Sequence, residues 1–168
     1  MNENQSFDIL ISAMENYEQV RDTAKFFYAD LKPIYCKAIS SDVKFNRIGF
    51  QHIIHKKGRH IRETPSQIER FKLLPLAVKL LELTTTYQEY ESEPMKLEVE
   101  HLGVDVFRNK RVTYWGIIAI LDGKKVKVIL RQVGNGAVHF WSIIPDWTTS
   151  KRRDTKYFSF MKGNPSED

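Results

Sequence analysis

The second half of the chain is built from strand-forming segments, and this pattern constrains the fold more than any other feature. From about Lys96 onward, four segments are rich in β-branched and aromatic residues: KLEVEHLG, RVTYWGIIAIL, KKVKVILRQV and AVHFWSIIP. Asp122-Gly123 and Gly134-Asn135-Gly136 separate the last three segments, and such residues favour tight hairpin turns. The pattern therefore predicts an antiparallel meander.

The N-terminal region has helical periodicity instead. Apolar side chains recur every three or four residues across 6–31, which predicts an amphipathic helix ended by Pro33. The recurring positions are Phe7, Leu10, Ile11, Met14, Tyr17 and Val20. The alternation in VKFNRI predicts a short strand over 43–48, and Gly49 then allows a turn into a helix, FQHIIHKK, that ends at Gly58.

A further helix is predicted in TPSQIERFKLLPLAVKLLEL, which begins at Thr64. Thr64 is expected at the N-cap, Pro65 at the first helical position, and Gln67 where a capping box places Gln or Glu. Pro75 is expected to kink or split this helix, because it lacks a backbone donor and its ring collides with the preceding turn. EYESEP, residues 89–94, is predicted to be a loop.

Helices followed by strands indicate an α+β domain, with N-terminal helices packed on one face of a C-terminal antiparallel sheet of about four strands. The chain has 168 residues, 42% of them hydrophobic, which suits one core. We expect an N-terminal helical extension over 1–41, an α+β domain over 42–162 and a disordered tail over 163–168. The single cysteine, Cys36, cannot form an internal disulfide and is expected to be a buried apolar side chain.

The sequence contains no predicted membrane segment. No stretch reaches about 18 consecutive apolar residues, and the N-terminus MNENQSFDILISAMENYEQV is polar and acidic. It therefore resembles neither a transmembrane helix nor a secretory signal. We expect a cytoplasmic protein without a membrane partner.

Charge is distributed unevenly along the chain. Residues 42–80 contain nine Lys and Arg against three Asp and Glu, and residues 124–162 contain nine against two. The intervening residues 81–100 contain one basic residue and six acidic ones. If the fold brings the two basic blocks to one face, they predict a polyanionic partner such as nucleic acid. The alternative is that they form solvated surfaces that point in different directions.

Three of the five histidines lie in RIGFQHIIHKKGRHIR, among five Lys and Arg and before any carboxylate. His52 and His55 are three residues apart and Lys56 is four beyond His52, so all three are expected on one side of the predicted helix, and Arg59 continues that side. Metalloprotease helices instead space two histidines by four and place a Glu between them, and surrounding cations repel a metal ion. We therefore expect no metal and no cofactor. A plainer alternative is that one histidine packs in the core while the other is exposed.

The closing strands contribute polar side chains among apolar ones. Arg131 follows an apolar run, and His139 and Ser142 interrupt the strand AVHFWSIIP. Alternation predicts that His139 and Trp141 share one face and that Ser142 lies on the other with Phe140. Ser142 alternatively satisfies a backbone group, and Arg131 alternatively covers the sheet edge with its stem.

Imidazole and cations without carboxylates suit metal-independent cleavage of RNA. One histidine can take the proton of the 2′-hydroxyl while a second group protonates the leaving 5′-oxygen, because a pKa near 6.5 allows both forms at neutral pH. Cations stabilise the charge that develops on the phosphate and lower the pKa of neighbouring histidines.

Three segments in this order carry a resemblance: VKFNRIGFQHIIHKKGR, SQIERFKLLPLAVKLL and KVKVILRQVGNGAVHFWSIIP, within residues 43–145. Together they resemble the phage-associated branch of the barnase, EndoU, colicin-type and RelE-like (BECR-fold) nucleases, small ribonucleases with N-terminal helices and a four-stranded antiparallel sheet. The resemblance implies a ribonuclease toxin or effector that is inhibited by a cognate antitoxin protein. It also implies acid–base roles for His52 and His55, phosphate contacts from Lys56, Arg59 and Arg131, and a substrate-orienting role for Ser142.

The predicted partner is RNA, with tRNA as one candidate. Besides the catalytic candidates, the residues expected to contact RNA are Lys57, Arg59, Arg62, His139, Trp141, Lys151, Arg152 and Arg153. One alternative is a non-catalytic RNA-binding module in which Trp141, Trp147 and Tyr157 stack on bases while SKRRDTK holds phosphates. Another is a protein-interaction domain whose basic face binds an acidic partner.

Overall fold

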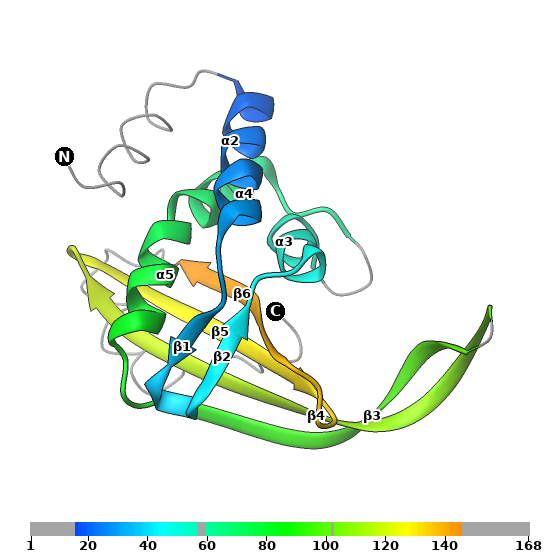
Figure 1. Ribbon diagram of the computed structural model, residues 1–168. Helices are drawn as coiled ribbons and strands as arrows, with labels where there is room; N and C mark the ends of the chain where they lie inside the picture. The colour runs from blue at the N-terminus through cyan, green and yellow to red at the C-terminus, as the bar shows by residue number, and fades with distance from the viewer. Residues whose placement is uncertain (1–15, 57–59, 102, 146–168) are drawn as a thin grey trace, which may run out of the picture.

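The computed structural model describes residues 16–56, 60–101 and 103–145 of the chain (Figure 1). The helices are α2 (Tyr17–Asp30), α3 (Arg47–Ile54), α4 (Thr64–Lys72) and α5 (Leu74–Leu83), with a short 3-10 helix η1 (Lys37–Ile39). The strands are β1 (Ile34–Cys36), β2 (Ser41–Lys44), β3 (Glu89–His101), β4 (Val104–Leu121), β5 (Lys124–Val133) and β6 (Val138–Pro145). The predicted α+β class is confirmed.

The strands form one mixed sheet in the order β1-β2-β6-β5-β4-β3. The predicted meander is confirmed, because β3, β4, β5 and β6 pair consecutively and antiparallel. Asp122, Gly123 and Gly134 adopt positive φ angles of 51°, 74° and 56° at the predicted turns. The sheet has six strands rather than about four, since β1 and β2 join it and β2 pairs parallel to β6. That pairing joins residues about 95 positions apart, which local periodicity does not reveal.

The start of α3 differs from the prediction of a strand over 43–48. Strand β2 ends at Lys44, and the Asn46 side chain accepts a hydrogen bond from the Gly49 backbone N–H at 2.9 Å, which caps a helix that starts at Arg47. The helix also ends earlier than predicted, at Ile54, and His55 is already extended. The backbone N–H of Lys56 then donates to the carbonyl oxygen of His60, so the chain turns back there. The predicted end at Gly58 lies outside the described residues.

Of the other predicted helices, α2 covers the described part of 6–31, with Asn16 as its N-cap; residues before 16 are not described. Pro75 does divide the next helical region, into α4 and α5. Its predicted capping box is wrong, because Glu63 occupies the N-cap without a side-chain bond and Gln67 instead donates to the carbonyl oxygen of Arg62.

The loop predicted for 89–94 is also wrong, since these residues belong to β3. Regular pairing runs without a break from Glu89↔Gly116 to Pro94↔Arg111. Pro94 is tolerated because β3 is an edge strand, where one side of the backbone needs no partner in the ladder.

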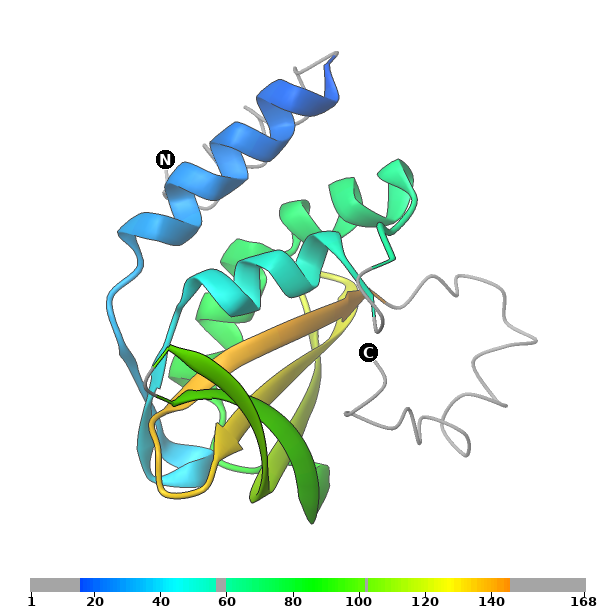
Figure 2. The ribbon, with the colours of Figure 1, turned by 90° about the vertical axis from the view of Figure 1, so that its right-hand side faces the viewer.

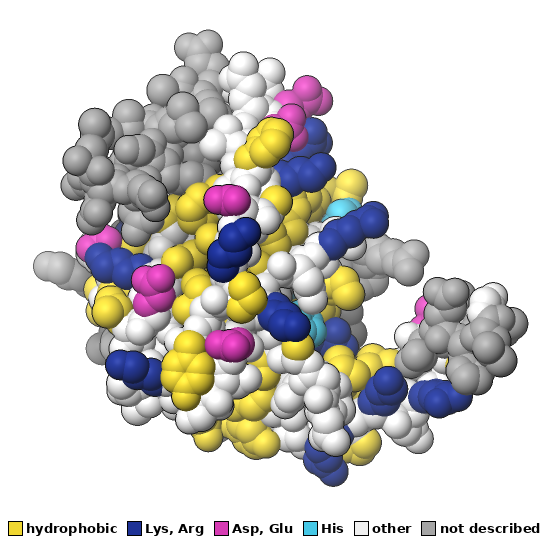
Figure 3. All heavy atoms as spheres, viewed as in Figure 1, with side chains coloured by type: hydrophobic (Ala, Val, Ile, Leu, Met, Phe, Trp, Pro, Cys, Tyr) yellow, Lys and Arg dark blue, Asp and Glu magenta, His cyan; other side chains and the backbone are white. Residues whose placement is uncertain are grey.

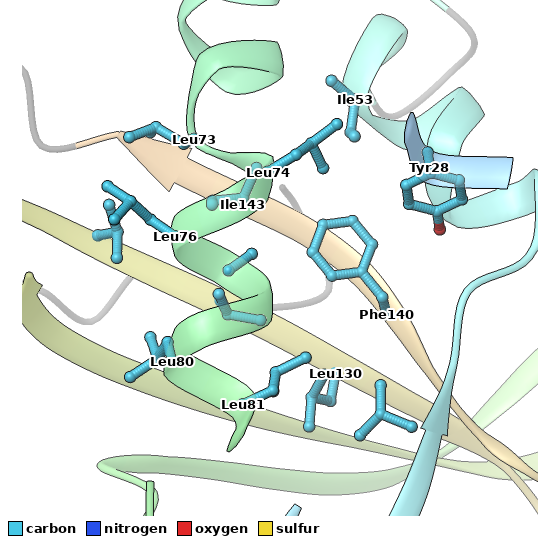
Figure 4. Close-up of a cluster of buried hydrophobic side chains, with 14 of the residues drawn as sticks. Tyr28, Ile53, Leu73, Leu74, Leu76, Leu80, Leu81, Leu130, Phe140 and Ile143 are labelled. Atoms are coloured by element: carbon cyan, nitrogen blue, oxygen red, sulfur yellow. The ribbon is translucent and has the colours of Figure 1, made fainter. Parts of the chain in front are cut away.

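The main core lies between the helices and one face of the sheet (Figures 2 and 4). This core includes Leu74, Leu76, Leu80 and Leu81 of α5 and Leu130, Phe140 and Ile143 of the sheet, and Figure 4 shows Leu74 and Leu81 on the side of the helix where Phe140 and Leu130 lie. The same core includes Val20, Ala24 and Tyr28 of α2 and the buried Cys36 of β1, so the N-terminal elements pack into it too. Cys36 is buried, as predicted. Truncating one such leucine to alanine typically costs about 2–5 kcal/mol.

A smaller cluster lies on the sheet face that does not carry the main core, which we call the second face. Its buried members are Val112, Tyr114 and Ile129, all from β4 and β5. The same face holds an ion pair in which Lys127 Nζ lies 2.6 Å from a Glu89 carboxylate oxygen, with only 3% of the Lys127 side chain exposed. Gly116 makes room for Glu89, because a side chain at this position would collide with the carboxylate.

Strands β3 and β4 extend beyond the rest of the sheet as a two-stranded arm (Figures 1 and 2). Strand β5 pairs with β4 only as far as Val112↔Val133, whereas β3 pairs with β4 out to His101↔Val104. From Pro94↔Arg111 outward, each strand of the arm therefore has only the other as its partner within the described sheet.

Candidate functional site

Helix α3 lies against β6 where that strand lacks a neighbouring strand. Strand β2 pairs with β6 only at Val138 and His139, so the edge of β6 is open from Phe140 onward. Gly49 of α3 approaches this edge so closely that a side chain there would collide with the carbonyl oxygen of Phe140 and the hydroxyl of Tyr28. Three residues further on, the His52 ring contacts the Trp141 indole, with 4.2 Å between ring centroids.

A β-bulge in β6 determines which side chains reach the second face. Leu130 pairs with Phe140, but its neighbour Ile129 pairs with Ser142, so Trp141 is an extra residue in β6. Ser142 therefore lies on the face of Ile129 and not with Phe140, which corrects the simple alternation. His139 pairs with Arg131, two residues from Ile129, and so shares that face.

Five side chains meet around the extra residue, and we call them the Trp141 cluster: His52, Tyr114, Arg131, His139 and Trp141. The Arg131 guanidinium carbon lies 4.3 Å from the Trp141 ring centroid and 5.8 Å from that of Tyr114. The His139 and Tyr114 rings approach the indole edge-on, at 6.0 Å and 6.4 Å. The cluster thus joins two imidazoles and a guanidinium through one indole.

Burial and charge set the protonation of the cluster. Burial lowers the pKa of His139 from its usual 6.5, a backbone hydrogen bond with Ala137 opposes this, and the Arg131 charge lowers it further. His139 is therefore neutral at pH 7 and able to accept a proton. The pKa of Tyr114 is raised by burial, with Arg131 opposing and the nearby Glu91 and Glu93 adding to the increase. The site is consequently bordered by carboxylates on β3, which the acid-free segment around His52 did not suggest.

Three buried nitrogen atoms of the cluster have no hydrogen-bond partner within the described structure: Arg131 Nε, His139 Nε2 and Trp141 Nε1. Leaving a buried polar group unpaired costs about 1–3 kcal/mol, so folded proteins rarely do so without a reason. Two of these atoms are donors, and the third belongs to a neutral imidazole whose other nitrogen bonds the backbone of Ala137, so it accepts. A bound group that offers both acceptor oxygens and a hydroxyl donor would satisfy them.

The other helix-borne candidates do not join these contacts. The Nδ1 atom of His55 lies 3.1 Å from the carbonyl oxygen of Gln51, at the end of α3. Lys56 lies after the C-terminal end of α3 and not within the helix, because α3 ends at Ile54. His55 and Lys56 are thus not on one helical side with His52, contrary to the spacing argument.

Arg62 and Ser142 are buried, and their side chains form hydrogen bonds within the fold. Arg62 is 8% exposed and its Nε donates to the carbonyl oxygen of His52 at 3.4 Å. Ser142 is fully buried and its hydroxyl accepts from Arg70 Nη1 at 2.9 Å, the same nitrogen that donates to the Ile143 carbonyl oxygen. Arg70 of α4 therefore bonds the open edge of β6.

The remaining candidates lie outside the described residues: Lys57, Arg59, Trp147, Lys151, Arg152, Arg153 and Tyr157. Tyr114, a member of the cluster, and Lys44, on the neighbouring strand β2, were not singled out from the sequence. Lys44 is exposed and pairs with His139 in the parallel ladder, which places the two side chains on one face. Its position in the alternating segment VKFN was the only signal for it.

No three His, Cys, Asp or Glu side chains in the described part of the chain are grouped as metal ligands. None of the helices there is both long and apolar enough to cross a membrane. No family model, curated protein or solved structure matches the chain.

Proposed function

We propose that the protein is a metal-independent endoribonuclease whose active site is the Trp141 cluster. The observation that carries the proposal is the convergence of two imidazoles, His52 and His139, and the Arg131 guanidinium on one indole, beside the three buried nitrogens named above. Two imidazoles provide acid–base catalysis near neutral pH, and a guanidinium binds phosphate oxygens.

In the proposed reaction His139 is the base. Its lowered pKa keeps the ring neutral at pH 7, so it can take the proton of the 2′-hydroxyl. The 2′-oxygen then forms a bond to phosphorus as the bond from phosphorus to the 5′-oxygen breaks. His52 donates a proton to that leaving oxygen, and the products are a 2′,3′-cyclic phosphate and a free 5′-hydroxyl.

Arg131 stabilises the negative charge that builds up on the phosphate oxygens in the transition state. Trp141 already contacts His52 and Arg131, so we assign it a positioning role instead of the base stacking expected from the sequence. Lys44, on the same face as His139, adds positive charge beside the site. His55, Lys56, Arg62 and Ser142 are not included in this mechanism.

The resemblance to BECR-fold nucleases supports the same proposal through the order of helices and meander, and it extends to a toxin or effector role with a cognate inhibitor. The parallel strand pair β2–β6 and the long arm go beyond the four-stranded arrangement of that family. The proposal therefore depends on the Trp141 cluster and not on strand number.

The test is incubation of total RNA and purified tRNA with the protein in excess EDTA. We expect discrete fragments that end in 2′,3′-cyclic phosphate. His139→Asn and His52→Asn should each reduce the cleavage rate by about 10²-fold or more, the usual contribution of an acid or base. His60→Asn is the matched control, because His60 is exposed and makes none of the cluster contacts.

Cleavage that requires added metal, or that persists in both variants, would contradict the proposal. RNA that is bound but never cut would indicate a non-catalytic RNA-binding module. Neither cleavage nor binding would favour a protein-interaction domain.

A further inference from the structure

The arm carries a row of cations on the same face as the Trp141 cluster. Along β4, side chains alternate between faces, so Arg108, Lys110, Val112 and Tyr114 share one face, and Tyr114 pairs with Arg131. At about 3.4 Å per residue, Lys110 lies about 14 Å and Arg108 about 20 Å from Tyr114 along the strand. We call Arg108 and Lys110 the basic row.

The basic row is accessible and has apolar neighbours. Arg108 and Lys110 are both exposed, and they pair with Leu97 and Met95, which are partly buried. Figure 3, which looks onto the side of the molecule that carries the helices, also shows Lys and Arg side chains on the arm. Cations beside apolar side chains on a projecting ribbon fit a nucleic-acid strand, whose phosphates and bases use both kinds of contact.

Acidic residues limit where a polyanion can lie. Glu91 and Glu93 occupy the same face on the edge strand β3, beside Tyr114 and Val112. Glu98, farther out on β3, pairs with Phe107 and so lies on the opposite face, with Lys96. The favourable path therefore runs over β4, from the cluster to the inner half of the arm where the basic row lies, and not over the inner part of β3.

We propose that the basic row binds the phosphates of a single-stranded RNA a few nucleotides from the cleavage site. This inference rests on the proposed function, since it takes the RNA of that proposal as the ligand. The cluster contacts the scissile phosphate, and the arm holds the continuing strand. The arm thus makes the protein prefer an RNA that extends several nucleotides beyond the site over a dinucleotide.

The opposite face of the arm provides a matched control. Lys96 and Arg111 are exposed like the basic row, but they pair with Asn109 and Pro94 and so point to the other face. Lys96 lies over the Phe107 ring there, with 5.1 Å between its Nζ and the ring centroid. Replacing either pair by glutamine removes two positive charges from the arm.

The experiment measures the dissociation constant of a fluorescent, fully 2′-O-methylated 12-nucleotide RNA at several salt concentrations. Arg108→Gln/Lys110→Gln should weaken binding several-fold and reduce the slope of log K against log salt by about 1.4, since each contact to a single strand contributes about 0.7. Lys96→Gln/Arg111→Gln should retain the wild-type slope.

Equal losses of RNA affinity in the two double variants would overturn the inference, because they would show a response to net charge alone. Wild-type affinity in the basic-row variant would overturn it as well. The methylated RNA cannot be cleaved, so binding is read independently of catalysis. Binding through the basic row without cleavage of natural RNA would remove only the proposed reaction. Cleavage of natural RNA with unchanged binding in the basic-row variant would remove only the role of the arm.

Discussion

At the scale of single residues, the position of His139 in the sheet lowers the pKa of its imidazole and keeps the ring neutral at pH 7. The strand places the imidazole beside Arg131 and Trp141 in a partly buried position, and burial is the main cause of its lowered pKa. The nearby guanidinium acts in the same direction, because two positive charges at this distance repel each other. A histidine in this setting gains a proton less readily than it would in the unfolded chain.

This predicts a specific dependence of stability on pH. Above pH 6.5 both states keep His139 neutral, and its contribution to stability is complete. As the pH falls below 6.5, the unfolded state binds the proton first, so the free energy of unfolding decreases until the pH passes the lower, native pKa of His139. His139→Gln should lack this decrease, whereas the exposed-site control His60→Gln should retain it.

Urea unfolding of the three proteins at half-unit steps from pH 7.5 to 5.0 checks this. The difference in unfolding free energy between wild type and His139→Gln should shift in favour of the variant as the pH falls. Parallel curves for these two proteins would show that the native environment does not disfavour the charged ring.

At the scale of elements, α3 replaces a strand at the edge of the sheet. Strand β2 is short, and α3 and α4 cover the part of β6 that β2 does not reach, with Arg70 bonding a carbonyl oxygen there. Gly49 allows the approach because it has no side chain. The position of His52 against Trp141 depends on this approach, since both residues lie close to the Gly49 contact.

Gly49→Ala is therefore expected to destabilise the protein by about 1–3 kcal/mol, the usual cost of overpacking a dense interior. Helix propensity alone would predict a gain of up to about 1 kcal/mol, so the sign of the change distinguishes the two effects. Gln51→Ala, at an exposed position of the same helix, is the control and should change stability little. Urea unfolding at pH 7.5 measures both, and a stabilised Gly49→Ala protein would mean that α3 can move away from β6.

At the scale of the whole molecule, the sequence predicts what is local and misses what is not. The β-turns, the division at Pro75 and the meander follow from residues close together in the chain. The parallel β2–β6 pair and the bulge at Trp141 depend on distant contacts. The sequence identified Arg131, His139 and His52 as polar residues in apolar or basic segments. It did not show that they meet at Trp141, because that contact depends on α3 reaching β6. The burial of Lys127 likewise depends on a distant residue, Glu89.

Within the described sheet, the outer arm is the part on which the fold depends least. Residues 99–101 and 104–106 lie beyond the pair Glu98↔Phe107 and pair only with each other in the described sheet. The whole segment 99–106 can therefore be replaced. Replacing it by Asn-Gly would close the hairpin with a two-residue turn whose twist matches antiparallel strands. Met95, Leu97, Arg108 and Lys110 all remain, so the second-face contacts and the basic row are preserved.

The shortened protein should accordingly unfold within about 0.5 kcal/mol of wild type in urea, as expected for changes away from packed positions. It should also bind the methylated 12-nucleotide RNA at least as tightly, because the removed residues include no Lys or Arg and both cations of the row stay. Weaker RNA binding with unchanged stability would place the RNA contact at the tip and contradict the path over the inner arm. A hairpin without further partners is only marginally stable, which is why little stability should be lost. A clear loss of stability would therefore show that the outer arm contributes to the fold.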